Sequence, residues 1–544
     1  MLTTDEIVLP DQGDNIIRTK DDNFQVDPKG IGHELFVALK SHKGKLALIE
    51  ADTGKEESYD DLLKKSIRIA CHLKKMGITH NDIIVPCTTN HLNSSAVFHA
   101  ISFSGAKSAG MDPFAPDADR TKQLQLVKPK LIFTIPESIE PLEKIIKSIG
   151  LNTKIVVFGK TDKHTSFDEF LIPLPEEEKS FLPYETNDVQ ETALIVFSSG
   201  TTGLPKATCV THYAAMCIFG KGMDWPRQTY LSYSSFVWAS QIVQALSSSC
   251  LGGIKIQASG FEPEKTLRYF EKYKVTFCFL APQDVISLIK HGIPKDLELP
   301  HLKFFCPVGG GLSIETIEKL RKMFPMSLIY ITYGQTELWN ASLQPDLSPK
   351  GLELFARKPG SCGRPAKGST YKVVDLDTGK RLGPNQPGEL YVKSKTNTPG
   401  YYGEDKFDRY DDDGFLKTGD ILYYDEDKWF YFVERHKEML RYKMIAIAPS
   451  ELEGILIQHP SVKLAAVIGK PTDEGDLATA VIVKKNDNVT AEELEALVAA
   501  KVDERKKLRG GVLFVDENEI PMTPTGKVSR RLLKQYILKK IEGQ

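Results

Sequence analysis

The sequence predicts an α/β protein. We expect a large, multi-subdomain N-terminal domain of stacked α/β layers with a small β-rich unit, followed by a smaller α/β C-terminal domain. The chain has 544 residues, several times a typical domain, and its 41% hydrophobic content is enough for large buried cores. Helical periodicity alternates twice with short β-branched runs, which is typical of βαβ units around a parallel sheet. After Pro349 the pattern changes to short strands and turns.

The two alternating series come first along the chain. From Ser58 to Lys160, the helical stretch "YDDLLKKSIRIACHLKKMGI" precedes the strand-like runs "DIIVPCT", "KLIFTI" and "KIVVFG". The run Ala193 to Phe197 then enters a glycine-rich loop. A second series follows, with "FEPEKTLRYFEKYKVTFCFLAP", "PQDVISLIKHGI", "LKFFCPVGGG" and "SIETIEKLRKMFP". Two such series predict two stacked or interlocked layers.

The later elements define the remaining units. The runs "GSTYKVVDLDTGKRL", "GELYVKS" and "DGFLKTGDILYYDEDKWFYFV" predict an antiparallel, β-rich unit over residues 350–434. Beyond it, "SELEGILIQHP" and "TAEELEALVAAKVDE" read as helices, and "KLAAVIGK" and "ATAVIVKK" as strands. We therefore place a large domain at 1–434, a joint at 435–437 and a small domain at 438–544.

Composition narrows the classes of partner. With 70 Lys and Arg against 72 Asp and Glu, the net charge is -2, so no overall attraction to nucleic acid or acidic membranes is expected. The eight cysteines are scattered without a CxxC pair and predict reduced, buried thiols. No apolar run approaches the ~18 residues that span a bilayer. The first thirty residues are too acidic for a signal peptide, and the last three are no peroxisomal address, so a cytoplasmic protein is expected.

The glycine-rich loop "IVFSSGTTGLPKAT", Ile195 to Thr208, predicts an anion site. Hydroxyls and free backbone amides in a turn that leaves a strand form an anion nest, and a nearby ammonium adds a point charge for phosphate. The loop is not a Walker A motif. Pro205 precedes Lys206 and has no N–H to donate, and Ala207 follows it and cannot ligate magnesium.

The stretch "SSGTTGLPK" resembles the phosphate-binding signature of the adenylate-forming (ANL) superfamily. This superfamily contains acyl- and aryl-CoA synthetases, firefly-type luciferases and peptide-synthetase adenylation domains. Further signatures follow in the family's order, between Ser58 and Leu533: "YGQTE", "KPGSCGRPAKG", "GELYVKS", "PGYYG", "LKTGD", "ERHKEMLRYK" and "PMTPTGK". The chain looks most like the branch of luciferases and 4-coumarate-CoA ligases.

The resemblance implies a reaction in two halves. A carboxylic acid attacks the α-phosphate of ATP to give an acyl-adenylate and pyrophosphate, and the acyl group then passes to coenzyme A. The first half implies a metal-bound nucleotide with Glu337 as the Mg²⁺ ligand, because a hard cation prefers carboxylate and phosphate oxygens. The positions that match the family's nucleotide-binding motifs are Ser198, Ser199, Gly200, Thr201, Thr202, Gly203, Lys206, Gly309, Gly310, Gly311, Tyr333, Gly334, Thr336, Asp420 and Arg435.

The implied roles divide the nucleotide among these residues. The loop from Ser198 to Lys206 holds the β- and γ-phosphates, Thr336 contacts phosphate, and Tyr333 stacks on adenine. Asp420 accepts hydrogen bonds from the ribose hydroxyls, with Arg435 assisting. Two alternatives stay open at this point: Tyr333 as a core aromatic that closes a strand, and Asp420 as a helix cap or turn residue.

Two lysines carry the implied catalytic movement. Lys527 resembles the lysine that contacts both the carboxylate and the phosphoryl oxygens in the first half, where negative charge gathers. Lys437 matches the pivot about which the C-terminal domain rotates, so this domain is expected to be mobile. The alternative for each is a solvated surface lysine.

Several positions depart from the family pattern. Met444 stands where a glycine usually leaves room for pantetheine, which puts thioester formation in question. Arg441 replaces a lysine common in luciferase-like members, and we count it among the catalytic candidates. Glu434 replaces the usual Asp, and Thr332 replaces a glycine. The predicted substrate pocket, an apolar one with a few polar groups, consists of Trp238, Ser240, Gln241, Thr332 and Trp339, although the two tryptophans can equally be core residues.

These observations leave a leading function and an alternative. The leading hypothesis is an ATP-dependent carboxylic acid:CoA ligase, and the alternative is a luciferase-like monooxygenase that oxidises an adenylate with O₂. Lys527, Glu337 and the phosphate loop argue against a merely adenylate-binding protein, and no carrier domain that would make a peptide-synthetase module follows Lys527.

Overall fold

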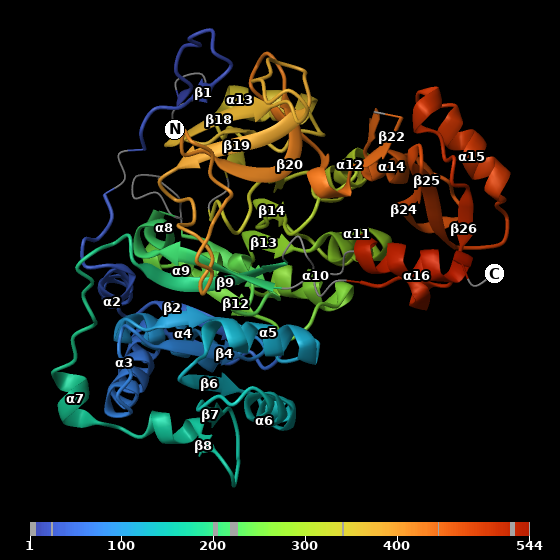
Figure 1. The fold of residues 1–544 in the computed structure, drawn as a ribbon. Helices are drawn as coiled ribbons and strands as arrows, with labels where there is room; N and C mark the ends of the chain where they lie inside the picture. Colours follow the sequence, from blue (N-terminus) through green and yellow to red (C-terminus); the bar gives the residue numbers. More distant parts are fainter. Residues whose placement is uncertain are drawn as a thin grey trace.

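Two seven-stranded sheets form the main layers of the N-terminal domain (Figure 1). The computed structural model describes residues 7–22, 25–199, 205–217, 227–339, 342–443, 445–522 and 528–542. The first sheet runs in the spatial order β10 (Pro205–Thr211), β9 (Thr192–Ser199), β5 (Lys107–Ala109), β4 (Ile83–Cys87), β6 (Leu131–Thr134), β7 (Lys154–Val157) and β8 (Thr165–Ser166). The second runs β15 (Leu328–Ile329), β14 (Phe304–Pro307), β13 (Phe277–Leu280), β11 (Thr229–Ser232), β12 (Ile254–Gln257), β2 (Leu46–Glu50) and β3 (Glu56–Ser58).

Both sheets are parallel except at one edge. Only β10 in the first sheet and β3 in the second pair antiparallel with their neighbours. Central strands such as β4 are buried at every position, as expected when helices cover both faces of a parallel sheet. The predicted pair of α/β layers is therefore confirmed.

The helices of this domain pack around and between the two sheets. They are α2 (Ile31–Ser41), α3 (Tyr59–Lys75), α4 (Leu92–Ser104), α5 (Asp117–Val127), α6 (Ile139–Ser148), α7 (Pro175–Lys179), α8 (His212–Cys217), α9 (Ala239–Leu251), α10 (Pro263–Lys272), α11 (Pro282–His291) and α12 (Ile314–Met323). Helix α4 contacts both β2 and β4, and eleven of its thirteen residues are buried, as expected for a helix enclosed on all sides. Helix α3 begins at Tyr59 because Ser58 and Asp61 form a reciprocal capping box.

The β-rich unit is an antiparallel sheet that includes a strand from the N-terminal segment. Its order is β1 (Ile17–Arg18), β18 (Ser369–Val374), β19 (Gly388–Ser394), β20 (Leu416–Tyr424) and β21 (Phe430–Arg435). Two short strands, β16 (Leu343–Gln344) and β17 (Arg364–Pro365), form a separate antiparallel pair. In the sequence they come after β15 and before β18. The region after Pro349 opens with helix α13 (Pro349–Arg357) rather than a strand. Ser348 caps this helix and proline occupies its first turn, which together are a helix-start signal. The sequence prediction missed this signal because strand-like segments surround it.

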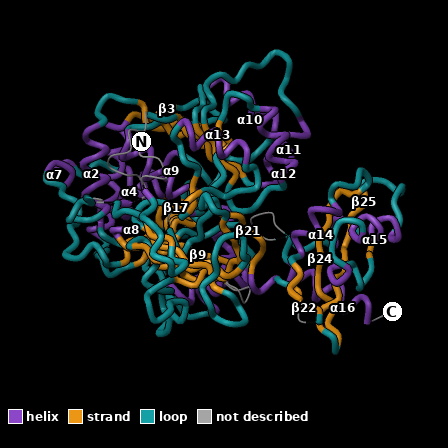
Figure 2. The backbone as a smooth tube through the Cα atoms, turned by 90° about the horizontal axis from the view of Figure 1, so that it is seen from above, coloured by secondary structure: helices purple, strands orange, loops and turns teal. Residues whose placement is uncertain are grey.

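The C-terminal residues form a separate small α/β body, which lies to one side of the layers in both views (Figures 1 and 2). Its sheet has the order β23 (Ile445–Ile447), β22 (Leu440–Tyr442), β25 (Gly475–Lys484) and β24 (Val462–Thr472), with β26 (Val512–Phe514) paired to β25. The helices are α14 (Pro449–Leu456), α15 (Ala491–Ala499) and α16 (Arg530–Glu542). A short 3-10 helix, His436–Glu438, joins β21 to β22.

Two features bear on the compositional predictions. All eight cysteines are free thiols and seven of them are buried, so the prediction of reduced, buried cysteines is confirmed. Within the described ranges, every helix is too short or too polar to cross a bilayer.

Candidate active site

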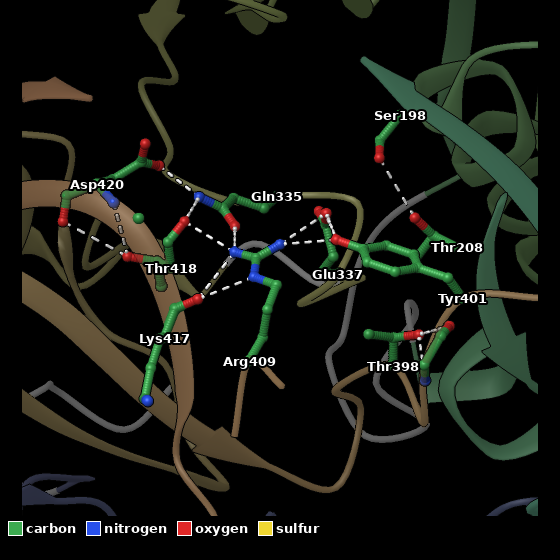
Figure 3. Close-up of polar contacts among 12 residues, drawn as sticks. Ser198, Thr208, Gln335, Glu337, Thr398, Tyr401, Arg409, Lys417, Thr418 and Asp420 are labelled. Atoms are coloured by element: carbon green, nitrogen blue, oxygen red, sulfur yellow. Dashed lines mark hydrogen bonds and ion pairs between the residues drawn. The ribbon is translucent and has the colours of Figure 1, made fainter. Parts of the chain in front are cut away.

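The predicted phosphate loop joins two paired strands. Ser199 of β9 lies opposite Pro205 of β10, and Ser198 lies opposite Lys206. Gly200, Thr201, Thr202 and Gly203, which join them, are outside the described residues. The hydroxyls of Ser198 and Thr208 are 3.4 Å apart at the base of this hairpin (Figure 3). Strand pairing thus brings a predicted phosphate hydroxyl and the predicted cation to the same strand end.

A distant loop packs against this hairpin. Cys209 N donates to Gly400 O at 3.0 Å, and Thr398 Oγ1 donates to Cys209 O at 2.7 Å. The ammonium of Lys206 lies 4.3 Å from the centre of the Tyr401 ring, within the range of a cation–π contact. The "PGYYG" signature therefore packs against the predicted phosphate region, although sequence reasoning assigned no role to Tyr401.

Glu337 is a buried carboxylate next to Tyr401. Its Oε1 accepts hydrogen bonds from Tyr401 Oη and from Arg409 Nη1, each at 2.8 Å (Figure 3). Within the described part of the chain, Oε2 has no hydrogen bond. No group of three His, Cys, Asp or Glu side chains that could hold a metal ion occurs among the described residues. One open carboxylate oxygen fits Mg²⁺, which commonly takes one or two carboxylates and completes its coordination with phosphate oxygens and water.

Asp420 lies at the other end of the same polar network. This residue is 3% exposed, and its Oδ2 accepts from Tyr333 Oη at 2.9 Å and Gln335 Nε2 at 2.5 Å. Arg435, opposite it on β21, brings its Nε to 3.5 Å from Oδ1. Burial raises the pKa of Asp420, although Arg435 and the two donors act in the opposite direction. The carboxylate is thus already held by donors and suits acceptance of ribose hydroxyls.

Arg409 connects the two carboxylates. Its Nη2 lies 3.3 Å from Gln335 Oε1, and Gln335 in turn donates to Asp420 (Figure 3). Burial is the largest single influence and opposes the charge of Arg409, but Glu337 and Tyr401 together with Tyr333 outweigh it and raise the pKa of the guanidinium above its usual value. Sequence reasoning missed both Arg409 and Gln335. The sequence offered one signal for Arg409: it is the single arginine in the acidic stretch "GEDKFDRYDDDG", where a cation can pair with a carboxylate.

The predicted adenine region combines a buried ring with open backbone. Tyr333 is 7% exposed and packs in the core of the β-rich unit, so it has a core role as well as a polar contact with Asp420. The glycines follow strand β14, and a Cβ at Gly309 or Gly311 would meet no atom within 4 Å. Gly309 has a φ of 87°, which favours glycine there. Gly310 lies between them, Gly334 is exposed and Thr336 is half-buried.

The predicted substrate-pocket residues separate into two groups. Trp238, Ser240 and Thr332 are half-buried, and Ser240 Oγ donates to Ser234 Oγ at 3.1 Å. Gln241 and Trp339 are buried instead. Trp339 packs in the core around α4, which matches the core alternative for this tryptophan. Helix α9 turns Gln241 inward, toward Lys255.

The joint and the C-terminal candidates lie at the edge of the small body. Lys437 is exposed in the 3-10 helix, and Arg441 Nη1 is 3.3 Å from Asp377 Oδ1 of the large domain. Glu434 is buried and accepts from the backbone N–H of Ser450 at 3.1 Å. Lys527 and Met444 lie outside the described residues. The structure therefore places Lys437 in the segment between β21 and β22, and the expected catalytic lysine is not among the described residues.

Comparisons with known proteins match nearly the whole chain. The model of the AMP-binding enzyme family matches residues 35–402, and that of the AMP-binding enzyme C-terminal domain matches residues 451–527. Luciferin 4-monooxygenase of Photinus pyralis is 31% identical over 94% of this chain and 95% of its own. 4-Coumarate–CoA ligase 3 of Arabidopsis thaliana is 31% identical over 92% of this chain and 90% of its own.

Solved structures share the fold. The luciferase-like enzyme from the nonluminescent mealworm Zophobas morio is 34% identical, with a TM-score of 0.72, over 77% of this chain and 99% of that one. ATP-bound MatB from Rhodopseudomonas palustris has a TM-score of 0.81 at 21% identity, over 93% of this chain and 99% of its own, and is similar in fold.

Proposed function

The chain belongs to the family of AMP-binding enzymes and is an adenylate-forming enzyme; from that premise we propose that it is an acid:CoA ligase, which activates a carboxylic acid with ATP and passes the acyl group to coenzyme A. One observation supports the adenylation half of this reaction most strongly. The two carboxylates that the sequence assigns to ribose and to Mg²⁺, Asp420 and Glu337, belong to one hydrogen-bonded network beside the β9–β10 hairpin.

In this proposal the network orients the nucleotide for attack at the α-phosphate. Asp420 accepts the ribose hydroxyls, Tyr333 contacts the adenine, and Lys206 with Ser198 holds the outer phosphates. Glu337 supplies a carboxylate oxygen to Mg²⁺, which when bound would neutralise charge on the phosphate oxygens. Holding the acid and the phosphate in line accounts for a large part of such catalysis, because it replaces the entropy cost of an encounter.

Lys527 completes the proposed site from the small domain. Negative charge accumulates on the phosphoryl oxygens as the acid attacks, and a lysine beside them stabilises that charge. We place the large domain at 1–434, the joint at 435–437 and the moving domain at 438–544. Closure would then bring Lys527 to the nucleotide, and Lys437 and Arg441 lie where the two bodies change contacts.

The second half of the reaction distinguishes the two candidate functions. The 4-coumarate–CoA ligase relative supports CoA as acceptor, and the Photinus relative supports oxidation of the adenylate by O₂. Met444 in place of the usual glycine favours the second. The 34% identical solved relative comes from a nonluminescent insect, which favours an enzyme without light emission.

The decisive experiment is pyrophosphate release with a panel of fatty, cinnamic and luciferin acids, each with and without CoA. We expect acid-dependent pyrophosphate from ATP and Mg²⁺, a thioester when CoA is present, and no light. Release that does not depend on any acid contradicts an acid ligase. Light without a thioester establishes the monooxygenase instead.

Met444→Gly sharpens the same experiment. Removal of the side chain should widen the path of the pantetheine arm, so thioester yield should rise while acid-dependent pyrophosphate release stays constant. Equal thioester rates in the two forms would show that Met444 does not restrict the acceptor.

A further inference from the structure

Arg409 uses all three guanidinium nitrogens in hydrogen bonds within the proposed site. Nε and Nη2 donate to Lys417 O at 3.1 and 2.8 Å, and Nη2 also donates to Thr418 O at 2.8 Å. Nη1 donates to Glu337 Oε1 at 2.8 Å and to Tyr401 Oη at 3.1 Å. The backbone contacts come from strand β20, the same strand that carries Asp420.

These contacts fix the guanidinium in place. The two carbonyl acceptors belong to a strand that is paired on both sides, with β19 and β21. Arg409 is also largely buried, with 21% of its side chain exposed. A side chain held this way does not swing aside to admit a metal ion. These contacts hold the guanidinium beside Glu337.

The donors to the Glu337 carboxylate all bind one of its two oxygens, Oε1, in the described part of the chain. Arg409 and Tyr401 both donate to Oε1, and the carbonyl of Glu337 accepts from Thr398 N at 2.8 Å, which fixes the backbone as well. Oε2 has no hydrogen bond within the described ranges. Outer donors of this kind orient a ligating carboxylate and are commonly necessary for full metal affinity.

We propose that Arg409 is a positioning residue that joins the metal end of the nucleotide site to its ribose end. It holds Glu337 by Oε1 so that Oε2 is presented to Mg²⁺. Through Gln335 it fixes the position of that carboxylate relative to Asp420. This inference rests on the proposed function, because it takes Glu337 as the Mg²⁺ ligand and Asp420 as the ribose acceptor.

Arginine suits this task and lysine does not. A planar fork can donate to Glu337 on one side and to the carbonyls of Lys417 and Thr418 on the other. An ammonium is a compact charge that can reach one of these sides at a time. Lysine at this position would keep the positive charge but lose the fixed geometry.

The test uses the full-length chain and four variants. Arg409→Lys and Arg409→Gln change the positioning residue, and Tyr401→Phe removes the hydroxyl that donates to Oε1 and accepts from Arg409 Nη1. Arg381→Gln is the matched control, because Arg381 is an exposed arginine of the same domain that pairs with Asp14 and Asp413. ATP binding is measured by calorimetry at a series of Mg²⁺ concentrations without an acid, and AMP binding in EDTA. Thermal unfolding of each variant is recorded.

Both Arg409 variants should raise the Mg²⁺ concentration for half-maximal ATP binding by about 10- to 100-fold. AMP affinity in EDTA should change by less, roughly threefold, because Asp420 keeps its contacts with Tyr333 and Arg435. Tyr401→Phe should give a smaller shift, and Arg381→Gln none. If the Arg409 variants prove unstable, Tyr401→Phe tests the same geometry.

Three results overturn the inference. An unchanged Mg²⁺ requirement with a lower melting temperature shows that Arg409 is only structural. A lower Mg²⁺ requirement shows that Arg409 competes with the metal instead of positioning its ligand. Full rescue by lysine shows that charge alone is needed. If the unaltered protein binds no ATP with Mg²⁺, the proposed function fails before Arg409 is tested.

Discussion

Two buried charged groups in the large domain have opposite surroundings. Arg409 faces the carboxylate of Glu337 at 2.8 Å in the polar network of the proposed nucleotide site. Lys255 of β12 is 0% exposed, and no ion pair with a carboxylate is found for it among the described residues. Its ammonium meets Ser95 Oγ at 3.2 Å, the side-chain amide group of Gln241 at 2.8 Å and the face of Phe236 at 4.9 Å.

The comparison shows how pairing decides the state of a buried charge. Burial lowers the pKa of Lys255 to about 7, because neutral amide and hydroxyl partners do not replace the water that an ammonium loses. The guanidinium of Arg409 keeps its charge with Glu337 beside it. Substitutions around the Arg409–Glu337 pair should therefore change ligand binding, and substitutions of Lys255 should change the free energy of unfolding.

The largest expected effect is on catalysis, at Lys527, which we propose acts on the nucleotide from the small domain. Lys527→Ala should lower acid-dependent pyrophosphate release by about 10²- to 10³-fold, because one donor to the developing phosphoryl charge is lost. ATP binding should be largely kept. Stopped-flow pyrophosphate assays and calorimetry measure the two effects. Lys539→Ala, in the same C-terminal segment, is the control and should match the unaltered protein. Normal release in Lys527→Ala contradicts the assignment.

A smaller effect is expected for Asp420. Asp420→Ala removes the proposed ribose acceptor and should weaken AMP binding by about 10- to 100-fold, since a hydrogen bond to a charged group contributes roughly 1.5–3 kcal/mol. Calorimetric titration with AMP checks this. The exposed Asp405 provides the control substitution, Asp405→Ala. Equal AMP affinity in both variants would remove Asp420 from the site.

The smallest effect on activity, and the clearest on stability, is expected for Lys255. The pKa is about 7 in the folded protein and 10.5 for a lysine exposed to water, so the cost of burying the ammonium is fully present below pH 7 and fades as pH rises toward 10.5. The unaltered protein should therefore gain up to roughly 4 kcal/mol over this range from this group. Lys255→Met should lack the gain.

Urea unfolding between pH 6 and pH 10 measures this difference. The exposed Lys303→Met serves as the control and should keep the pH dependence of the unaltered protein. Parallel pH curves for Lys255→Met and the control would show that Lys255 finds a charge partner, and the contrast with Arg409 would disappear.

Much of the fold was predictable because it follows local patterns. Apolar β-branched runs such as that of β4 predicted buried parallel strands, and the alternation with helices predicted two layers. Helix α13 was missed although Ser348 and Pro349 carry a start signal, because the nearby strands dominated the pattern. Strand β1 was missed because two residues carry no periodicity, and only pairing with β18, some 350 residues later, defines it.

The candidate residues of the site came from sequence signatures and not from local patterns of secondary structure. Ser198, Lys206 and Asp420 were identified from signatures, and strand pairing determines their neighbours. Arg409 was not, because its partners come from the separate segments that hold Glu337, Tyr401 and the carbonyls of β20. Helical spacing alone did not show that Gln241 is buried beside Lys255, so its place in a substrate pocket stays a prediction.

A crystal structure with a non-hydrolysable acyl-AMP analogue tests the central claim most directly. The account predicts the ribose hydroxyls within hydrogen-bond distance of Asp420, the adenine beside Tyr333 and the phosphate directed toward Glu337 and the β9–β10 hairpin. An analogue bound elsewhere, with Asp420 still held only by Tyr333, Gln335 and Arg435, would contradict it.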